Sequence, residues 1–498
     1  MEGFALKLSR FTILALLLAL LGITACSKAP DGALRFGLAK APITLDPRFA
    51  TDAVSSRINR LIYQSLIDFD ESYRVIPALA QWQQISPRHY RFQLRDSATF
   101  HDGSPLTAAD IKATYDSILD PAINSPHRAG FDMVDTIQVV DNNTVDFMLN
   151  KPDLLFPGRL VIGIMPAAAL NAKHPFNQQP LGSGPFAFDA WPEEGTLHLK
   201  RLADSQRFSF IAVENPTVRV LKLLRGEIDM LQNDIPSEMV TYLEKQEAIQ
   251  VIKGRGSNFT YLGFNLEDAE TGNLKLRQAI AYALDRDAII RYVMGGAATP
   301  ASALLPPDHW AGTDLPLYGY DPARARLLLK DAGYTPGKRP KLLYKTSSDP
   351  FRIRLATIIQ QQLTDIGVDV DLRSYDWGTF YGDIKAGRFQ MFSLSWVGIK
   401  TPDIFRYAFH SSAVPPEGSN RGRYSDGITD ALIEAAEAAP TLEQQAEEYK
   451  KVQARLLEQL PYVPLWYEDH IFAAHKNISG YTVARDGNYD GLMHVTRH

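Results

Sequence analysis

The stretch Phe389–His410, FQMFSLSWVGIKTPDIFRYAFH, changes character in its middle. Its first part, 389–396, is an aromatic and aliphatic run with the length of one mostly buried strand. The pattern then breaks, and Thr401-Pro402-Asp403 predicts the start of a helix, with the threonine as N-cap and the proline in the first position. In α/β proteins, ligand contacts often lie where a strand ends in a loop before a helix. Trp396, at this strand end, is therefore predicted to be either a core residue or a ligand contact.

The composition is that of a globular protein rather than of a disordered or fibrous one. Of the 498 residues, 45% are hydrophobic and 22% are charged, so the chain is long enough for two or three domains with their own cores. The formal net charge is −5, and lysine and arginine are scattered along the chain rather than clustered. This distribution argues against nucleic acid as a partner and favours small molecules or proteins.

The amino-terminal segment has the pattern of a bacterial signal. Two basic residues precede the apolar run Phe11–Ile23, which is short for a membrane span and typical of a signal peptide. The run continues into LGITAC, and Cys26 is the only cysteine, so no disulfide can form within the chain. The segment resembles a bacterial lipoprotein signal, in which Cys26 becomes the lipidated first residue; a plain secretory signal is the alternative. We expect a signal peptide at 1–25 and a lipidated tether at 26–32.

Two further stretches predict helices with capped first turns. A helical pattern over 57–66 follows a short loop in which Thr51 or Asp52 is the expected cap. Further on, Thr107 and Asp110 have the spacing of a capping box, with aspartate in place of the usual glutamate. The loop before the first of these helices also joins a strand to a helix, so it is a second candidate for ligand contacts.

Several motifs together resemble one known family. They are Leu45-Asp46-Pro47, the turn and helix start at 99–111, Gly182-Ser183-Gly184-Pro185-Phe186, and the helix from Leu276 to Arg286. These residues and their order resemble the extracellular solute-binding proteins of family 5. The similarity continues along nearly the whole mature chain. That family includes binders of dipeptides, oligopeptides and nickel that supply ABC importers. Most of the 276–286 motif has apolar residues at helical spacing and is therefore expected to belong to core packing.

This resemblance implies an α/β protein with the two-lobed periplasmic-binding-protein fold, class II type, and an extra domain inserted in the first lobe. Closure over a ligand is then a hinge motion where the chain crosses between the lobes, expected near Asn265 and Lys476. The implied division is lobe I at 33–66, 185–264 and 478–498, the inserted domain at 67–184, and lobe II at 265–477.

The implied function is that of the substrate-binding component of an ABC importer. Such a protein captures a peptide or peptide-like polar solute between its lobes and delivers it to the permease subunits in the membrane. The resemblance implies a monomer of the periplasm or cell envelope, held on a membrane by lipid, that acts without a cofactor. Two alternatives remain open: a secreted lipoprotein hydrolase acting on peptides or glycans, and a sensor or chaperone-like lipoprotein that kept the fold without transport.

Common enzyme and metal motifs are absent from the sequence. It contains no G-x-S-x-G, S-x-x-K or H-E-x-x-H and no complete phosphate-binding loop, and no two carboxylates stand out as a glycosidase pair. The run Asp486–Gly491 fits the first half of a calcium loop, but the twelfth position holds Arg497 in place of the required glutamate. We therefore predict a turn there, and neither a metal site nor catalytic residues elsewhere.

One departure from the family concerns the ligand. In the family's peptide binders, the tryptophan at the strand end is followed three residues later by an aspartate, which pairs with the peptide's α-amino group. Here Ile399 stands in that place, and an ammonium buried without a carboxylate is strongly disfavoured. Lys400 would repel an ammonium and suit a carboxylate or phosphate, while Asp403 could substitute only if the loop folds back. An amino-blocked peptide or another polar solute is therefore expected, and the predicted contacts are Phe49, Ala50, Thr51, Asp52, Trp396, Val397, Gly398, Ile399, Asp403, Asn420 and Arg421.

Overall fold

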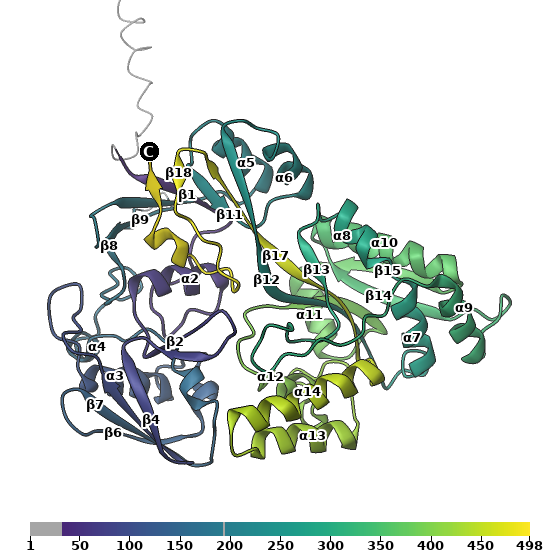
Figure 1. Ribbon diagram of the computed structural model, residues 1–498, viewed down its shortest axis with the longest axis horizontal. Coiled ribbons are helices and arrows are strands. Elements are labelled where there is room, and N and C mark those ends of the chain that lie inside the picture. Colours follow the sequence, from purple (N-terminus) through teal and green to yellow (C-terminus); the bar gives the residue numbers. More distant parts are fainter. Residues whose placement is uncertain (1–31, 193–194) are drawn as a thin grey trace, which may run out of the picture.

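The computed structural model describes residues 32–192 and 195–498. The predicted signal peptide and Cys26 lie outside these residues, as does the predicted tether except for Gly32. Within the described part of the chain, no helix has both the length and the apolar character needed to cross a membrane. The protein is mixed α/β, with one long sheet that runs through two lobes and a separate four-stranded sheet beside the first lobe (Figure 1).

An eleven-stranded sheet forms the frame of both lobes. Its order is β15-β14-β16-β12-β17-β11-β1-β10-β9-β8, and β13 pairs with β17 beside this path. β1 is parallel to both of its neighbours, and its central Phe36 is fully buried, as expected for an apolar strand inside a parallel sheet. The strands are β1 (Leu34–Leu38), β8 (Phe186–Ala190), β9 (Thr196–Arg201), β10 (Arg207–Ala212), β11 (Met230–Gln232), β12 (Ile249–Phe264), β13 (Ala298–Pro300), β14 (Lys341–Ser347), β15 (Asp369–Tyr375), β16 (Met391–Trp396) and β17 (Tyr462–His475).

The long antiparallel strands β12 and β17 connect the lobes, and they run side by side from one to the other in Figure 1. Their register shifts between Gly254 and Asn258. A Cβ atom at Gly256 would lie 2.1 Å from the carbonyl oxygen of Glu468, so the two backbones approach too closely for a side chain. Phe472 of β17 packs in the core of the first lobe, whereas Trp466 packs in that of the second. The irregular stretch therefore lies where both strands pass from one core to the other.

The separate sheet has the order β4-β5-β7-β6 and is covered by α3. Its core is rich in aromatic side chains, because Phe92, Phe147 and Phe156 meet at ring-centroid distances of 5.4 to 6.4 Å. The backbone amide of Thr107 donates to Asp110 at 2.7 Å, as the capping-box spacing predicts. The elements of this region are β2 (Ile67–Phe69), β3 (Val75–Pro77), β4 (Ala80–Ser86), β5 (His89–Leu94), α3 (Ala108–Leu119), β6 (Val134–Val139), β7 (Thr144–Leu149) and α4 (Ala167–Asn171).

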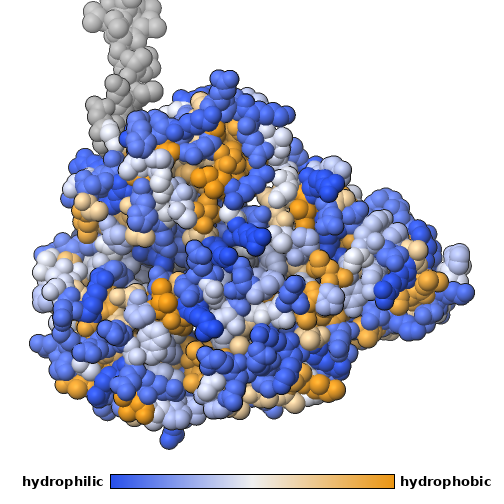
Figure 2. All heavy atoms as spheres, viewed as in Figure 1, coloured by the Kyte–Doolittle hydropathy of each residue, from blue (hydrophilic) through white to orange (hydrophobic). Residues whose placement is uncertain are grey.

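Helices cover the faces of the long sheet in both lobes. The first lobe has α2 (Ala53–Ile62), α5 (Pro216–Leu224) and α6 (Ser237–Leu243), and its last strands are β18 (Ile478–Ser479) and β19 (Thr496–Arg497). The second lobe has α7 (Leu274–Ala283), α8 (Arg286–Tyr292), α9 (Pro322–Asp331), α10 (Pro350–Ile366), α11 (Trp377–Lys385), α12 (Ile404–Phe409), α13 (Gly427–Ala438) and α14 (Leu442–Gln459). On the face shown in Figure 2, hydrophobic residues form small separate groups in a mostly hydrophilic surface.

Two predicted helix starts were wrong by a few residues. The helix expected over 57–66 is α2, which begins at Ala53 because Asp52 accepts a hydrogen bond from the amide of Ser55 at 2.9 Å and caps it. The helix expected from Thr401 is α12, whose N-cap is Asp403. Thr401 does not cap it; its hydroxyl donates to a carboxylate oxygen of Asp403 at 2.5 Å.

Candidate ligand-binding site

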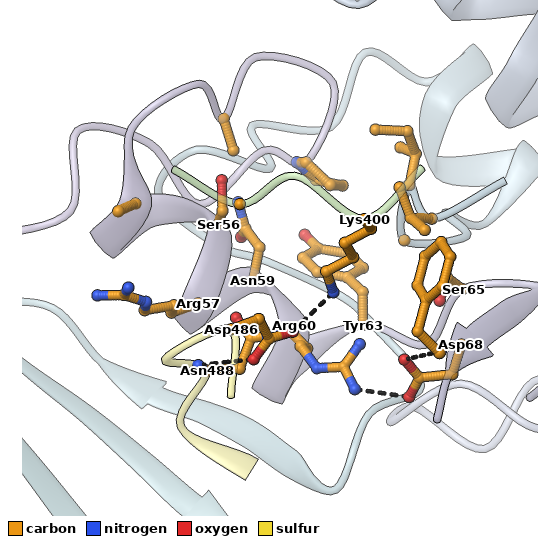
Figure 3. Close-up of a pocket in the computed structure, with 18 of the residues that line it drawn as sticks. Ser56, Arg57, Asn59, Arg60, Tyr63, Ser65, Asp68, Lys400, Asp486 and Asn488 are labelled. Atoms are coloured by element: carbon orange, nitrogen blue, oxygen red, sulfur yellow. Dashed lines mark hydrogen bonds and ion pairs between the residues drawn. The ribbon is translucent and has the colours of Figure 1, made fainter. Parts of the chain in front are cut away.

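A cavity of about 880 Å³ lies where the two lobes and the inserted region meet. One wall is α2, and the opposite wall is the loop that leaves β16 (Figure 3). The carboxy-terminal segment 486–493, residues 158–163 and the stretch Gln64–Phe69 also contribute to the lining. A cavity of this volume is of the size that proteins use for small-molecule ligands.

Most of the predicted contact residues line this cavity. They are Ala50, Thr51 and Asp52 at the start of α2, and Val397, Gly398, Ile399 and Asp403 in the loop after β16. The two strand-to-helix loops that sequence analysis identified separately are therefore brought face to face by the fold.

The remaining predicted contacts lie beside or behind the cavity wall. Phe49 is next to the lining residues, and the guanidinium of Arg48 lies 5.5 Å from its ring centroid. The guanidinium of Arg421 lies 4.7 Å from the ring centroid of Trp396 and donates to the hydroxyl of Tyr261 at 3.2 Å.

The Trp396 indole nitrogen is buried and has no hydrogen-bond partner among the described residues. Asn420 is buried, and its amide donates to the carbonyl oxygens of His410 and Tyr424, so its polar groups stabilise the loop.

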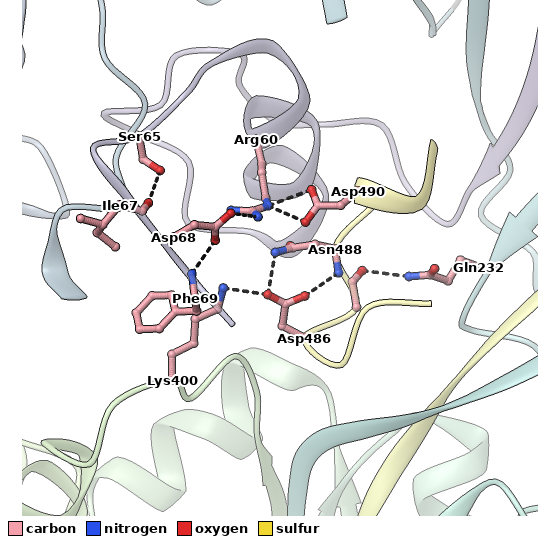
Figure 4. A network of polar contacts seen from close by, with 11 residues as sticks. Arg60, Ser65, Ile67, Asp68, Phe69, Gln232, Lys400, Asp486, Asn488 and Asp490 are labelled. Carbon is pink, nitrogen blue, oxygen red and sulfur yellow. Dashed lines mark hydrogen bonds and ion pairs between the residues drawn. The ribbon is translucent and has the colours of Figure 1, made fainter. Parts of the chain in front are cut away.

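Ion pairs from different parts of the chain converge on the cavity floor, as Figure 4 shows. Arg60 of α2 donates through Nε to both carboxylate oxygens of Asp490 at 2.9 Å, and through Nη2 to Asp68 at 2.5 Å. Burial alone would lower the pKa of Arg60, but the two carboxylates raise it above its usual value. The guanidinium is therefore fixed as a cation in this network.

Lys400 forms the second ion pair, and this pair joins the two lobes. Its ammonium lies 2.7 Å from a carboxylate oxygen of Asp486, in the carboxy-terminal segment. Burial alone would raise the pKa of Asp486, but the Lys400 ammonium and hydrogen bonds from Asn488 hold it below its usual value. The sequence analysis treated Lys400 as a cation available to a ligand, whereas the structure shows that its charge is matched within the protein.

Asp403 is also matched by a cation of the protein. Its carboxylate accepts from Nη1 of Arg159, in the inserted region, at 3.0 Å, so the loop after β16 contacts that region as well as the first lobe. A carboxylate held in this way is a weak partner for a ligand ammonium, because binding the ammonium would compete with an existing ion pair.

Several lining residues were not identified from the sequence, among them Arg57, Arg60, Asp68, Asp486 and Asp490. The two arginines belong to the polar face of an amphipathic helix, and this pattern is ordinarily a solvated surface. In the sequence, Asp486 and Asp490 stand out only as part of an incomplete calcium-loop motif. Among residues 32–192 and 195–498, no cluster of three or more histidine, cysteine or acidic side chains has the arrangement of a metal site.

Comparison with known proteins assigns the chain and its fold to a family. The family model for the middle part of the bacterial extracellular solute-binding proteins, family 5, matches residues 74–415, which is more than half of the chain. The chain belongs to this family. Family 5 members bind peptides or small molecules and work with ABC permeases, and they are binding proteins rather than enzymes.

The similarity to individual family 5 proteins extends over almost the full length of each chain. The dipeptide-binding protein of Escherichia coli is 25% identical over 96% of this chain and 97% of its own. Heme-binding protein A of Haemophilus influenzae is 28% identical over 92% of this chain and 91% of its own. The crystal structure of the ABC transporter substrate-binding protein CtaP of Listeria monocytogenes superimposes with a TM-score of 0.83, at 25% identity, over 94% of this chain and 100% of its own. The predicted two-lobed fold is therefore confirmed.

Proposed function

We propose that this protein is the substrate-binding component of an ABC importer, and that it captures a peptide or peptide-like polar solute in the cavity between its lobes. The observation that carries the proposal is the cavity itself. It has about 880 Å³, it lies where three parts of the chain meet, and both strand-to-helix loops line it. Relatives with the same architecture are named for a dipeptide and for heme, so the family alone does not select the ligand.

The same site supports binding without chemistry. Catalysis by carboxylates needs groups that are free to give or take a proton. In the described part of the cavity wall, Asp68 and Asp490 bind Arg60, Asp486 binds Lys400, and Asp52 caps α2. These acids are therefore occupied by structural contacts, which favours the binding function over the hydrolase alternative.

A ligand with a free α-amino group is disfavoured by the loop after β16. Ile399 lines the cavity and offers no charge, and Asp403 is already held by Arg159. We propose that the ligand is amino-blocked or otherwise lacks an ammonium near this loop, with Val397, Gly398 and Ile399 contacting it from the second lobe. The residues 50–52 contact it from the first lobe.

The hinge is proposed to lie in the crossing strands rather than near Asn265 and Lys476. The support is the register shift between Gly254 and Asn258, together with the change of core along β17 between Trp466 and Phe472. A break in strand pairing leaves fewer backbone hydrogen bonds to resist a change in dihedral angles. We propose that lobe II begins before residue 265, because Leu262 and Phe264 already pack in its core, and the other domain limits given by the resemblance remain a proposal.

The cellular location is proposed from the amino terminus and from the family. Lipid on Cys26 would hold the mature protein, a monomer, on a membrane facing the periplasm or cell envelope, close to its permease. More than one acyl chain is needed for stable attachment, and a lipoprotein modification supplies two or three.

The central experiment is titration calorimetry with matched free and amino-blocked peptides. Trialanine and N-acetyl-trialanine differ only at the amino end, so their affinities isolate the effect of the ammonium. We expect the acetylated peptide to bind more tightly, and saturating ligand to raise stability by about 2.7 kcal/mol at a hundredfold excess over Kd. Submicromolar binding of the free peptide that survives Asp403→Ala would contradict the role given to Ile399. Conversion of a ligand into product would contradict the binding function and support the hydrolase.

A further inference from the structure

Most charged side chains on the cavity wall form ion pairs within the protein. Among the cations of the wall, Arg57 does not. Arg60 and Lys400 both form ion pairs with aspartates. Among residues 32–192 and 195–498, no carboxylate lies within 4.0 Å of the Arg57 guanidinium. The cavity therefore presents one guanidinium whose charge the protein leaves without a counter-ion.

The surroundings of Arg57 hold its side chain at the wall. It lies in the first half of α2, is half-buried, and places its guanidinium 5.5 Å from the ring centroid of Tyr489. A Cβ atom at Gly487 would lie 2.8 Å from its Nη2 atom, so the absence of a side chain at 487 makes room for the guanidinium. Figure 3 shows Arg57 extending away from the network formed by Lys400 and Asp486.

Asp52, which lines the same cavity, forms no ion pair with Arg57 among the described residues. Asp52 precedes the same helix and accepts a hydrogen bond from Ser55, and an N-cap carboxylate is also stabilised by the positive end of the helix. Arg57 has no such compensation, because a cation in the first half of a helix gains nothing from the helix dipole. The unmatched positive charge therefore remains at Arg57.

A second polar group on the wall also lacks a partner. Asn59 is 5% exposed, its amide nitrogen donates to the carbonyl oxygen of Thr44 at 3.4 Å, and its Oδ1 atom has no hydrogen-bond partner among the described residues. A buried acceptor without a donor is unfavourable. Asn59 also lines the cavity, so a ligand that carries an N–H or O–H donor would satisfy it. Arg57 and Asn59 are two positions apart on a helix and do not face each other, so they would contact different parts of the ligand.

We propose that Arg57 is the anion anchor of this site and that it binds a carboxylate of the transported solute, while Asn59 accepts a hydrogen bond from a donor elsewhere on the same molecule. This inference rests on the proposed function and narrows its ligand to carboxylate-bearing solutes with N–H or O–H donors. A guanidinium suits this role because its fork matches the two oxygens of a carboxylate.

The test uses matched acids and amides, because they differ in charge and hardly in size. A library of N-acetyl dipeptides and tripeptides, each as the free acid and as the carboxy-terminal amide, is offered to the full mature protein and read by native mass spectrometry. The acids that bind are then titrated by calorimetry. We expect acids to be retained over their amides, and Arg57→Gln to weaken an acid by roughly tenfold to a hundredfold. The same variant should leave the weak affinity for the amide nearly unchanged.

Two further variants separate the anchor from general effects. Arg88→Gln removes the same charge from an exposed turn outside the cavity lining, so it should leave the acid affinity at the wild-type value. Arg57→Lys keeps the charge without the fork and should recover part of the affinity. Melting curves of all variants identify any that fail to fold, and the acid-to-amide ratio of the wild-type protein needs no variant at all.

The inference is overturned if amides bind as well as acids, if Arg57→Gln weakens acids and amides equally, or if only solutes without a carboxylate bind. In these outcomes a ligand is still captured, and the proposed function stands. If no member of this library and none of a wider set of peptides, sugars and amines shifts the melting curve, the proposed function fails as well.

Discussion

Replacing Asp486 by asparagine would remove the partner of Lys400 without changing the size of the side chain. The two residues belong to different lobes, so their ion pair exists only when the lobes are together. Asn488 donates to Oδ1 of Asp486 from its backbone amide and to Oδ2 from its side chain, so an asparagine, which has a single side-chain oxygen, can keep one of these two bonds. The substitution therefore removes the charge and one acceptor oxygen, while the bond from the Asn488 backbone amide can remain.

The size of the effect follows from distance and exposure. At 2.7 Å and an effective dielectric constant of about 20, two unit charges attract by about 6 kcal/mol. The side chains of Lys400 and Asp486 are 22% and 17% exposed, so the cost of removing both from water offsets much of this attraction. A charge-assisted hydrogen bond has a net value of about 1.5–3 kcal/mol. Its loss should shift the closing equilibrium towards the open form by roughly 10- to 150-fold.

The assay is small-angle X-ray scattering of the protein without ligand, supported by ligand titration. We expect Asp486→Asn to increase the radius of gyration and to weaken ligand binding. The control is Asp116→Asn, which breaks the exposed pair with Lys112 inside one helix and should change neither quantity. If Asp486→Asn shows the wild-type radius and the wild-type affinity at low salt, the lobes are not held together by this pair.

Four other outcomes are expected. The pKa of Asp486 is lowered in the closed form, so its contribution to closing is complete above the usual carboxyl value of 3.8 and is lost as the pH falls through the lowered value. Scattering from pH 6 to 3 should therefore show that the lobes open in acid. Opening towards alkaline pH would contradict this expectation. Gly256→Ala should cost about 1–3 kcal/mol in urea unfolding and change ligand affinity, whereas Gly337→Ala, with nothing within 4 Å, should do neither. Phe147→Ala should cost about 3–5 kcal/mol, because the ring is fully buried among aromatic side chains. Cys26→Ser should move the protein from the membrane fraction to the soluble fraction, and unchanged fractionation would refute the lipid anchor.

Part of the site was accessible from local sequence patterns. The loop after Trp396 and the loop that ends at Asp52 were both predicted to contact the ligand, because strand-to-helix loops often carry function in α/β proteins. Seven of the predicted contact residues line one cavity, whereas Phe49, Trp396, Asn420 and Arg421 are not among its lining residues. Asn420 shows what local patterns cannot predict. An asparagine in a loop has the same sequence signature whether its amide forms hydrogen bonds with a ligand or with the backbone.

The sequence by itself determined the family, through short motifs that stand in a fixed order, and the two-lobed α/β architecture followed as what that resemblance implies. Turns and caps could be predicted because they depend on a few neighbouring residues. The charge state of the cavity was decided only by the tertiary structure. Lys400 and Asp486 are separated by 85 intervening residues, and Arg60 and Asp490 by 429, so no local pattern joins them. Whether a charged side chain is neutralised or left for a ligand depends on which distant segment folds against it, and that choice is made by the packing of the two lobes.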